Sequence, residues 1–270
     1  MPSDFSISDL PMLSSPQNPR VKEYVDLRSD GNLRREKQCF FLEGRRSIEA
    51  ALSLNHVKVL ELIFSDHILG DDLSLIAKAR AKNVPLVRVS KDVYKKIADV
   101  MAPQGIAAVV RTPEWTLEEV LKKKDVLLVA ACGVQDPGNL GTLIRSCEAA
   151  GAAGLIVLEG SADPFNAKVV RATAAGLLSL PILRMKSDAF LKAMQSAKAR
   201  LVATSAHEGK PFKAFDWINR PLTLCIGSEG VGLPPEIEAA CREKVTIPMK
   251  GDAESLNAAV AASILLFQAM

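Results

Sequence analysis

Three polar, glycine-containing segments in the second half of the chain hold the residues best suited to chemistry. They are residues 135–145 (QDPGNLGTLIR), 226–233 (IGSEGVGL) and 247–257 (IPMKGDAESLN). Each lies at the end of an apolar run, and ligands of open α/β sheets bind beyond the carboxyl ends of the strands. Glycines also let the backbone turn sharply or approach a ligand closely. We therefore expect these segments to form one site.

Each segment has a functional and a structural interpretation. In the first, Asn139 and Arg145 lie on an expected helix whose N-terminus would favour an anion, but a loop, a cap and a surface arginine would explain them too. In the second, Glu229 stands between glycines and is either solvated or functional. In the third, Ser255 is a good N-cap type for a helix that opens there. Such a cap leaves Asn257, which is unfavourable inside a helix, without a structural reason.

The order of the glycines argues against one class of enzyme. Residues 227–232 read GxxGxG, the reverse of the dinucleotide fingerprint GxGxxG, and no Lys-Ser/Thr pair of a phosphate loop follows. A nucleotide-dependent oxidoreductase is therefore disfavoured.

A regular alternation of strands and helices must position these segments. Strands are predicted at residues 126–132, 155–158, 182–184, 201–204, 222–226 and 244–247. Helices are predicted at residues 139–150, 169–175, 189–199, 235–241 and 255–268. The apolar run VLLVAAC is typical of a parallel strand that is buried on both faces. The fold class is therefore α/β, with a mostly parallel sheet covered by helices on both faces.

A smaller α/β domain is predicted to precede this one. Its helices are expected at residues 45–54, 72–82 and 91–98, and its strands at residues 57–64, 84–89 and 105–110. Residues 1–17 are rich in Ser, Pro and Asp and are expected to form a flexible arm. Pro113 and the run Lys122-Lys123-Lys124 mark a linker over residues 112–124. The predicted domains are therefore residues 18–111 and 125–270.

Composition excludes some classes of protein and favours others. The chain has 270 residues, of which 48% are hydrophobic and 24% charged, so it is too apolar to be disordered. Its net charge is +3, and the excess lies in residues 1–124, which hold 20 Lys and Arg against 17 Asp and Glu. We expect no membrane span and no secretory signal. The five cysteines are scattered and form no CxxC pair, which favours a reducing cytoplasm and argues against a metal site.

Taken together, the three segments resemble a known family. The pattern NxGxxxRxxxxxG begins at Asn139, GSEGxG occupies residues 227–232, and IPMxGxxxSLNxxVA occupies residues 247–261. Their order and spacing are similar to those of the SpoU, or TrmH-type, RNA 2′-O-ribose methyltransferases. Residues 18–44 are more loosely similar to the start of the substrate-binding domain that precedes the catalytic domain in many members and resembles ribosomal protein L30e.

The resemblance implies a fold, a cofactor and a set of site residues. The catalytic domain would contain a deep trefoil knot of the SPOUT type, and the protein would be a homodimer with its active site at the interface. The methyl donor would be S-adenosylmethionine, with no metal. The expected cofactor-binding residues are Gly227, Ile247, Met249 and Leu256. The expected catalytic residues are Arg145, Asn139, Glu229, Ser255 and Asn257.

The expected reaction is transfer of a methyl group to a ribose 2′-hydroxyl of structured RNA, rRNA being favoured over tRNA. A guanidinium is a poor base because its pKa exceeds about 12, so we favour Arg145 as a cation that stabilises the developing alkoxide. Basic residues of the first domain are expected to bind the RNA, although a solvated helix face would explain them equally. They are Arg20, Lys22, Arg34, Arg35, Arg45 and Arg46. The alternative function is a non-catalytic RNA-binding or ribosome-assembly protein that has kept the fold.

Overall fold

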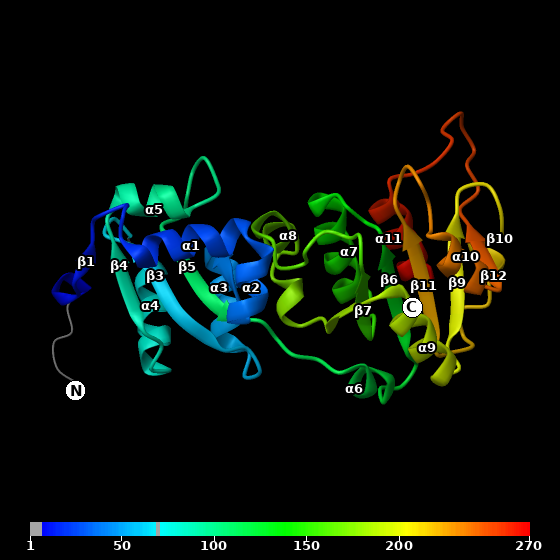
Figure 1. Ribbon diagram of the computed structural model, residues 1–270, viewed down its shortest axis with the longest axis horizontal. Coiled ribbons are helices and arrows are strands. Elements are labelled where there is room, and N and C mark those ends of the chain that lie inside the picture. The colour runs from blue at the N-terminus through cyan, green and yellow to red at the C-terminus, as the bar shows by residue number, and fades with distance from the viewer. Residues whose placement is uncertain (1–6, 69–70) are drawn as a thin grey trace. The chain divides into compact units, whose positions relative to one another are not determined.

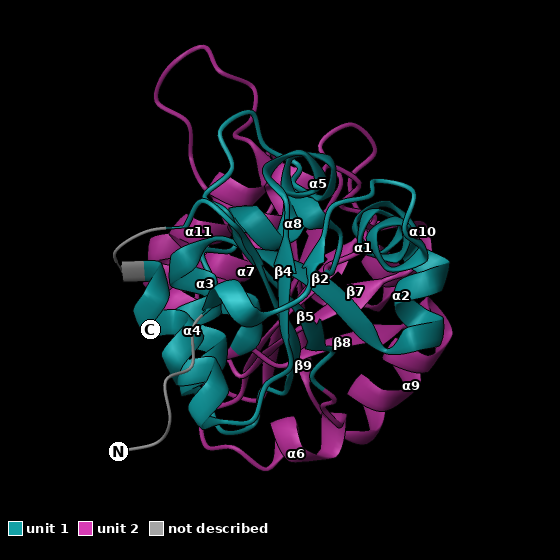
Figure 2. Cartoon of the chain, turned by 90° about the vertical axis from the view of Figure 1, so that its left-hand side faces the viewer, with its two compact units in different colours: residues 1–113, 165–178 teal, residues 114–164, 179–270 magenta. Residues whose placement is uncertain are grey.

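The computed structural model describes residues 7–68 and 71–270, and packing divides the chain into two units (Figures 1 and 2). Unit 1 consists of Met1–Pro113 together with Phe165–Leu178, and unit 2 of Glu114–Pro164 together with Ser179–Met270. Residues 1–6 of the predicted arm lie outside the described residues. None of the helices found in the described ranges has the length and apolar character needed to cross a membrane.

Unit 1 is built on a mixed five-stranded sheet in the order β1-β4-β3-β5-β2. Its strands are β1 (Met12–Leu13), β2 (Cys39–Glu43), β3 (Val59–Ser65), β4 (Leu86–Val89) and β5 (Ile106–Arg111). The pairs β1–β4 and β3–β4 are parallel, whereas β5 runs antiparallel to both β2 and β3. Because β1 pairs with β4, the structure differs from the predicted flexible arm at Met12–Leu13.

Helices cover both faces of this sheet. They are α1 (Pro19–Ser29), α2 (Gly31–Lys37), α3 (Arg45–Ser53), α4 (Asp71–Ala81) and α5 (Lys91–Ile97). Side chains alternate between the faces of a strand, so Cys39 and Phe41 of β2 pack in one cluster with residues of α1 and α5. Phe40 and Leu42 are also buried, on the opposite face of the same strand.

A segment distant in sequence completes unit 1. Phe165–Leu178 contains α8 (Ala167–Ala172) and a short 3-10 helix (Gly176–Leu178). The rings of Phe165 and Phe40 lie 5.1 Å apart, and His56 Nε2 lies 2.8 Å from the carbonyl oxygen of Leu178. Figure 2 draws α8 in the colour of unit 1. The packing thus places a stretch of the predicted residues 125–270 with the N-terminal sheet.

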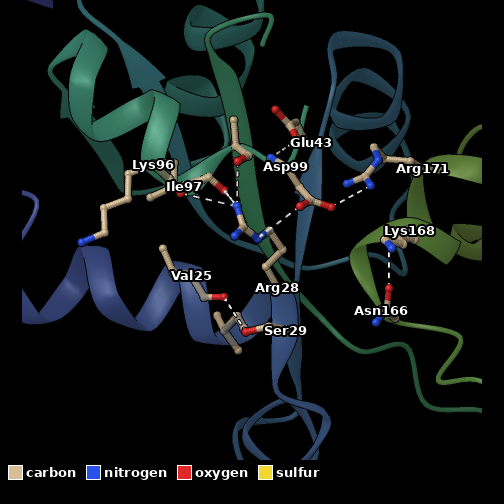
Figure 3. A network of polar contacts seen from close by, with 12 residues as sticks. Val25, Arg28, Ser29, Glu43, Lys96, Ile97, Asp99, Asn166, Lys168 and Arg171 are labelled. Carbon is tan, nitrogen blue, oxygen red and sulfur yellow. Dashed lines mark hydrogen bonds and ion pairs between the residues drawn. The ribbon is translucent and has the colours of Figure 1, made fainter. Parts of the chain in front are cut away.

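A polar network holds α8 on unit 1 (Figure 3). Arg171 Nη2 lies 2.7 Å from Asp99 Oδ2. Arg28 contacts the other carboxylate oxygen of Asp99 at 3.7 Å and donates to the carbonyl oxygen of Ala98 at 2.6 Å. The Asp99 main-chain N–H in turn donates to Glu43, and burial raises the pKa of that carboxyl group. The two arginines therefore share one carboxylate where α8 meets the end of α5.

Unit 2 contains a seven-stranded sheet in the order β10-β12-β9-β11-β6-β7-β8, and every pairing in it is parallel. Its strands are β6 (Leu127–Cys132), β7 (Gly154–Leu158), β8 (Ile182–Met185), β9 (Arg200–Ser205), β10 (Lys210–Pro211), β11 (Leu222–Gly227) and β12 (Glu243–Thr246). Every residue of β6 and β7 is buried. The predicted α/β class with a parallel sheet is confirmed.

Two groups of helices cover this sheet. The helices of unit 2 are α6 (Leu117–Leu121), α7 (Pro137–Ala149), α9 (Ser187–Ser196), α10 (Pro235–Ala240) and α11 (Ala258–Gln268). Helices α7 and α11 pack against each other, and a hydrogen bond of 2.7 Å joins Ser146 Oγ to Ser263 Oγ. Buried residues of α6, α9 and α10 form one cluster with Leu128, Ala130 and Cys132 of β6. The central strands are thus fixed from both sides, which leaves their carboxyl ends to build a site.

Candidate active site

The first motif segment opens helix α7. Asp136 is its N-cap, and its carboxylate accepts the main-chain N–H of Asn139 at 2.8 Å. Pro137 follows at the first helical position, where its missing N–H costs no helical hydrogen bond. Asn139 is thereby fixed in the first turn of α7.

The second segment forms a tight turn after β11. Ser228 and Gly232 exchange two main-chain hydrogen bonds of 3.0 Å, which closes the turn around Glu229. A Cβ on Gly227 would lie 2.3 Å from the main-chain carbon of Gly232. Only glycine fits at residue 227, because backbone atoms there cannot move aside.

The third segment ends at the start of α11, and here one prediction is wrong. The helix begins at Ala258, and its N-cap is Asn257 rather than Ser255. Asn257 Oδ1 accepts the main-chain N–H groups of Ala259 at 3.1 Å and Val260 at 3.2 Å. The residue that seemed misplaced inside a helix stands before it, where an Asn side chain satisfies otherwise unpaired N–H groups.

One carboxylate joins the three segments. Glu229 Oε1 accepts the side-chain N–H of Asn139 at 2.9 Å, a side-chain N–H of Asn257, and the main-chain N–H of Ala258 at 3.3 Å. Asn257 Nδ2 also donates to Asn139 Oδ1 at 2.8 Å. The negative charge of Glu229 is further favoured by the N-terminus of α11. The cluster of Asn139, Glu229 and Asn257 is hereafter the Glu229 cluster.

A cavity of about 180 Å³ lies beside the Glu229 cluster. Its walls include the four expected cofactor residues Gly227, Ile247, Met249 and Leu256, together with Glu229 and Ser255. Glu229 is the one formally charged residue among its walls in the described part of the chain. A phosphorylated cofactor would need cations at such a site, whereas apolar walls with hydroxyl groups fit an uncharged ring joined to a cationic sulfonium.

Arg145 lies apart from this cavity. It is exposed on α7, next to Ser146 at the contact with α11, and it is not among the residues that line the cavity. Within the described chain the structure therefore brings together Asn139, Glu229, Ser255 and Asn257 with the cavity, but not Arg145.

The expected RNA-binding residues of unit 1 fall into two groups. Arg20 forms an ion pair of 2.8 Å with Glu61, and Arg45 one of 2.7 Å with the buried Asp72. Arg34 is 4% exposed and donates to the carbonyl oxygens of Leu27 at 2.7 Å and Arg28 at 3.0 Å. The second group has exposed side chains and consists of Lys22, Arg35 and Arg46. Arg34 therefore has a structural role that its sequence context did not reveal.

Sequence reasoning missed one wall of the cavity. Thr204, Ser205 and Ala206, at the end of β9, line it, and Thr204 Oγ1 donates to the carbonyl oxygen of Cys225 at 3.0 Å. The signal was present, because β9 is a parallel strand whose carboxyl end carries hydroxyl residues. Without the strand order, β9 could not be placed next to β11.

Comparisons with known proteins agree with this geometry. Residues 126–267 match the model of the SpoU rRNA Methylase family, and residues 18–108 match that of the MRM3-like substrate binding domain. The chain is 30% identical to the 23S rRNA (guanosine(2553)-2'-O)-methyltransferase RlmP of Bacillus subtilis, over 94% of this chain and 97% of the relative.

Two solved structures have the same fold over nearly their whole length. One is the AdoMet-bound rRNA methyltransferase from Sinorhizobium meliloti, with a TM-score of 0.86 and 31% identity, covering 96% of this chain and 97% of the other. The second is the SpoU methyltransferase AviRb from Streptomyces viridochromogenes in complex with AdoMet, with a TM-score of 0.80 and 32% identity, covering 93% and 97%. The family match, the shared fold and the three motifs around one cavity establish that the chain belongs to the SpoU rRNA methylase family.

Proposed function

We propose that the protein is an S-adenosylmethionine-dependent methyltransferase that methylates a ribose 2′-hydroxyl of 23S rRNA. The observation that carries the proposal is the cavity whose walls hold Gly227, Ile247, Met249 and Leu256 beside the Glu229 cluster. The relatives support the substrate class. They differ in the nucleotide that they methylate, since one acts on a guanosine and another, 31% identical, on a uridine. The proposal therefore names the RNA and the ribose position, but no base.

The cavity residues suit S-adenosylmethionine, which would supply a methyl group made electrophilic by its sulfonium. Ile226, Ile247 and Leu256 offer apolar walls for the adenine ring, and Ser228 and Ser255 offer hydroxyl groups. Gly227 lines the cavity, and its lack of a side chain lets the main chain of Gly232 pack against it and so shapes the wall that faces the cofactor. The carboxylate of Glu229 at the rim favours a cationic ligand.

The chain's residues would serve two tasks in the transfer. The Glu229 cluster locks three loops together, which holds the cofactor and the hydroxyl at a fixed geometry. Arg145 would bind the target phosphate or lower the pKa of the 2′-hydroxyl, and it would stabilise the alkoxide that develops as that hydroxyl passes its proton to solvent water. Ser255, exposed at the cavity, orients the hydroxyl.

We also infer that the active enzyme is a homodimer. Three apolar side chains of the α11 region face solvent in the single chain, namely Val260 at 46%, Phe267 at 54% and Met270 at 72% exposure. Val260 and Phe267 stand seven positions apart and so share one face of α11, and exposed apolar side chains on one face favour association. Arg145 lies on α7, which packs against α11, so a second copy docked there would bring its own Arg145 towards a neighbouring cavity. We infer in addition a deep trefoil knot in unit 2, which the resemblance to the SPOUT class supports.

The remaining partners follow from the substrate. Unit 1 would bind the structured RNA through exposed cations, of which Lys22, Arg35 and Arg46 are the first candidates. We place the protein in the cytoplasm, where rRNA is assembled and where its five free, buried cysteines stay reduced.

Two measurements test the proposal. Calorimetry with S-adenosylmethionine should give one binding site per chain, and mapping of 2′-O-methylation should show one ribose of 23S rRNA modified only in cells that carry the gene. An RNA-binding protein without catalytic activity would give no heat with the cofactor and identical maps.

Arg145→Lys should lose most turnover while it retains cofactor affinity, because an ammonium cannot replace the planar donor set of a guanidinium. Near-native turnover would refute a special role for that group.

A further inference from the structure

Unit 1 contains a second cavity, far in sequence from the three motifs. It has a volume of about 200 Å³, several times the roughly 30 Å³ that one water occupies. Its walls come from the end of β3, from α5 and from the loop before β5. The lining residues are Ser65, His67, Ile68, Lys91, Tyr94, Lys95, Pro103, Gln104 and Gly105.

Helix α5 directs three side chains to this cavity. Lys91, Tyr94 and Lys95 stand at positions i, i+3 and i+4, which share one face of a helix. Both lysines are exposed, and neither forms an ion pair with another residue in the described ranges. Asp66 lies beside the cavity, 3.8 Å from His67 Nε2. The two lysines therefore place positive charge at the rim, which Asp66 offsets in part.

Tyr94 differs from the other residues of the cavity wall because it has a buried polar atom without a hydrogen-bond partner in the described part of the chain. Its side chain is 2% exposed, yet its hydroxyl oxygen is buried with no hydrogen-bond partner among the described residues. Burial raises the pKa of Tyr94 well above its ordinary value, and the charges of Glu43 and Asp72 add to this, so the hydroxyl keeps its proton and can donate. An unpaired buried hydroxyl costs free energy that a ligand would recover.

The other walls complete a site for a flat, polar ring. Pro103 and Ile68 are apolar and suit the faces of a ring, whereas the ring of Tyr94 packs in the core of unit 1. The Gln104 side-chain oxygen accepts the main-chain N–H of Arg45 at 2.9 Å, which fixes its amide at the rim. At Gly105, with φ of +80°, a Cβ would stand 3.2 Å from Ile68 Cγ2. Glycine thus leaves this side of the cavity open.

From these features we propose that the cavity binds a single unpaired nucleotide of the RNA, with an edge of the base at the Tyr94 hydroxyl and the phosphate at Lys91 and Lys95. Proteins read RNA largely through unpaired bases that are turned out of the helix, stacked on aromatic rings and hydrogen-bonded at their edges. The cavity could hold the base, and the two lysines at its rim could bind the phosphate of the same nucleotide. The inference rests on the proposed RNA substrate, and it gives unit 1 a role in choosing the target structure.

The test uses the full-length protein and two fluorescein-labelled RNA hairpins that differ by one unpaired nucleotide in the stem. The native protein should bind the bulged hairpin about tenfold more tightly than the paired one, since a hydrogen bond to a charged group contributes a factor of this size. The double variant Lys91→Ala/Lys95→Ala should lose this preference. Lys96→Ala is the matched control, because Lys96 lies on the same helix but outside the cavity and its ammonium donates to the carbonyl oxygen of Pro16.

Tyr94→Phe isolates the hydroxyl. It should reduce the preference for the bulged hairpin several-fold while the melting temperature of the free protein stays the same or rises, since the deleted hydroxyl has no partner there. A fall in melting temperature would show that the hydroxyl is already satisfied, by a buried water, and would overturn its assignment to a ligand. Inorganic phosphate at 10 mM, on the order of a weak anion's binding constant, should compete poorly. Full competition would show that the site binds an anion alone, and it would refute the proposal that the cavity binds a nucleotide.

Equal affinity of the native protein for both hairpins would refute the nucleotide cavity, as would an equal loss on both hairpins in the lysine double variant. Methylation of 23S rRNA, measured in parallel with native protein, separates this failure from the failure of the proposed function. If methylation persists without a bulge preference, the cavity proposal is wrong and the enzyme proposal stands. If the preference exists without any methylated ribose, the reverse holds.

Discussion

At the scale of single residues, Glu229 is the link between the three motif segments. One of its carboxylate oxygens receives N–H groups from Asn139, Asn257 and Ala258. Without it, the two amide side chains lose their shared acceptor, and each loop is free to shift. A displacement of about 1 Å at a reacting centre can lower a rate by about a hundredfold.

We therefore expect Glu229→Ala to lower kcat by about a hundredfold, measured as transfer of a radiolabelled methyl group to 23S rRNA. Glu229→Gln keeps one acceptor oxygen and should lie between Glu229→Ala and the native enzyme. Glu236→Ala, which removes an exposed acid from the first turn of α10, is the control and should be near native. Equal rates for Glu229→Ala and Glu236→Ala would contradict a positioning role.

The residue types of the site could be read from the sequence, but some of their roles could not. Glycine spacing marked Gly227 and Glu229 because few structural reasons place three glycines in six residues. Arg34 had no such mark. Its burial depends on how α2 folds back to present the guanidinium to the carbonyl oxygens at the end of α1, and no local pattern encodes that contact.

At the scale of elements, two residues before α11 have different roles, one structural and one expected to act in the reaction. Asn257 caps the helix, whereas Ser255 is exposed at the cavity and two positions before the cap. Asn257→Ala should cost about 1 kcal/mol of stability, the usual loss for a removed N-cap. Ser255→Ala should leave the melting temperature unchanged and lower kcat if Ser255 orients the hydroxyl. Thermal unfolding and methyl transfer on both variants test this, and destabilisation by Ser255→Ala would contradict the observed cap.

Sequence periodicity predicted most strands and helices, because amphipathic and buried runs are local properties. It did not predict the antiparallel position of β5, since strand order depends on contacts between distant residues. It also gave no sign that Phe165–Leu178 packs with unit 1. Apolar residues of this segment are buried, namely Val169, Val170, Leu177 and Leu178. Their apolar character predicts burial, but it does not indicate which of the two cores they belong to.

The ion pair of Arg171 with Asp99 gives a prediction about α8. Both side chains are about 30% exposed, at 28% and 31%, so solvent screens the pair and its loss should cost only about 0.5–1 kcal/mol. Arg171→Ala should increase amide hydrogen exchange in residues 165–178 more than elsewhere, because local opening of α8 becomes easier. The exposed Lys168 on the same helix provides the control. Equal protection in Arg171→Ala and Lys168→Ala would show that apolar packing alone holds the segment.

At the scale of the whole molecule, the net charge is unevenly divided between the two halves of the chain. The excess of +3 lies in residues 1–124, and part of it is used internally by Arg20, Arg34 and Arg45. Fewer cations of residues 1–124 are therefore free to meet RNA than their 20 Lys and Arg residues suggest. In the second half, exposed Val260, Phe267 and Met270 mark a face that a second copy would cover. Arg145, which belongs neither to the cavity wall nor to the Glu229 cluster, lies on α7, the helix that packs against α11.

If Arg145 serves the cavity of the partner subunit, two inactive chains should restore each other. Arg145→Ala removes the cation, and Leu256→Asp places a charge in the cavity wall. Co-expressed with different affinity tags and purified as a mixed dimer, they should show about half the native rate, because one of the two composite sites is intact in a symmetric dimer. A dimer of the native chain with the double variant should be inactive. If each chain instead used its own Arg145, the outcomes would reverse: the first dimer would be inactive, and the second would keep about half the rate.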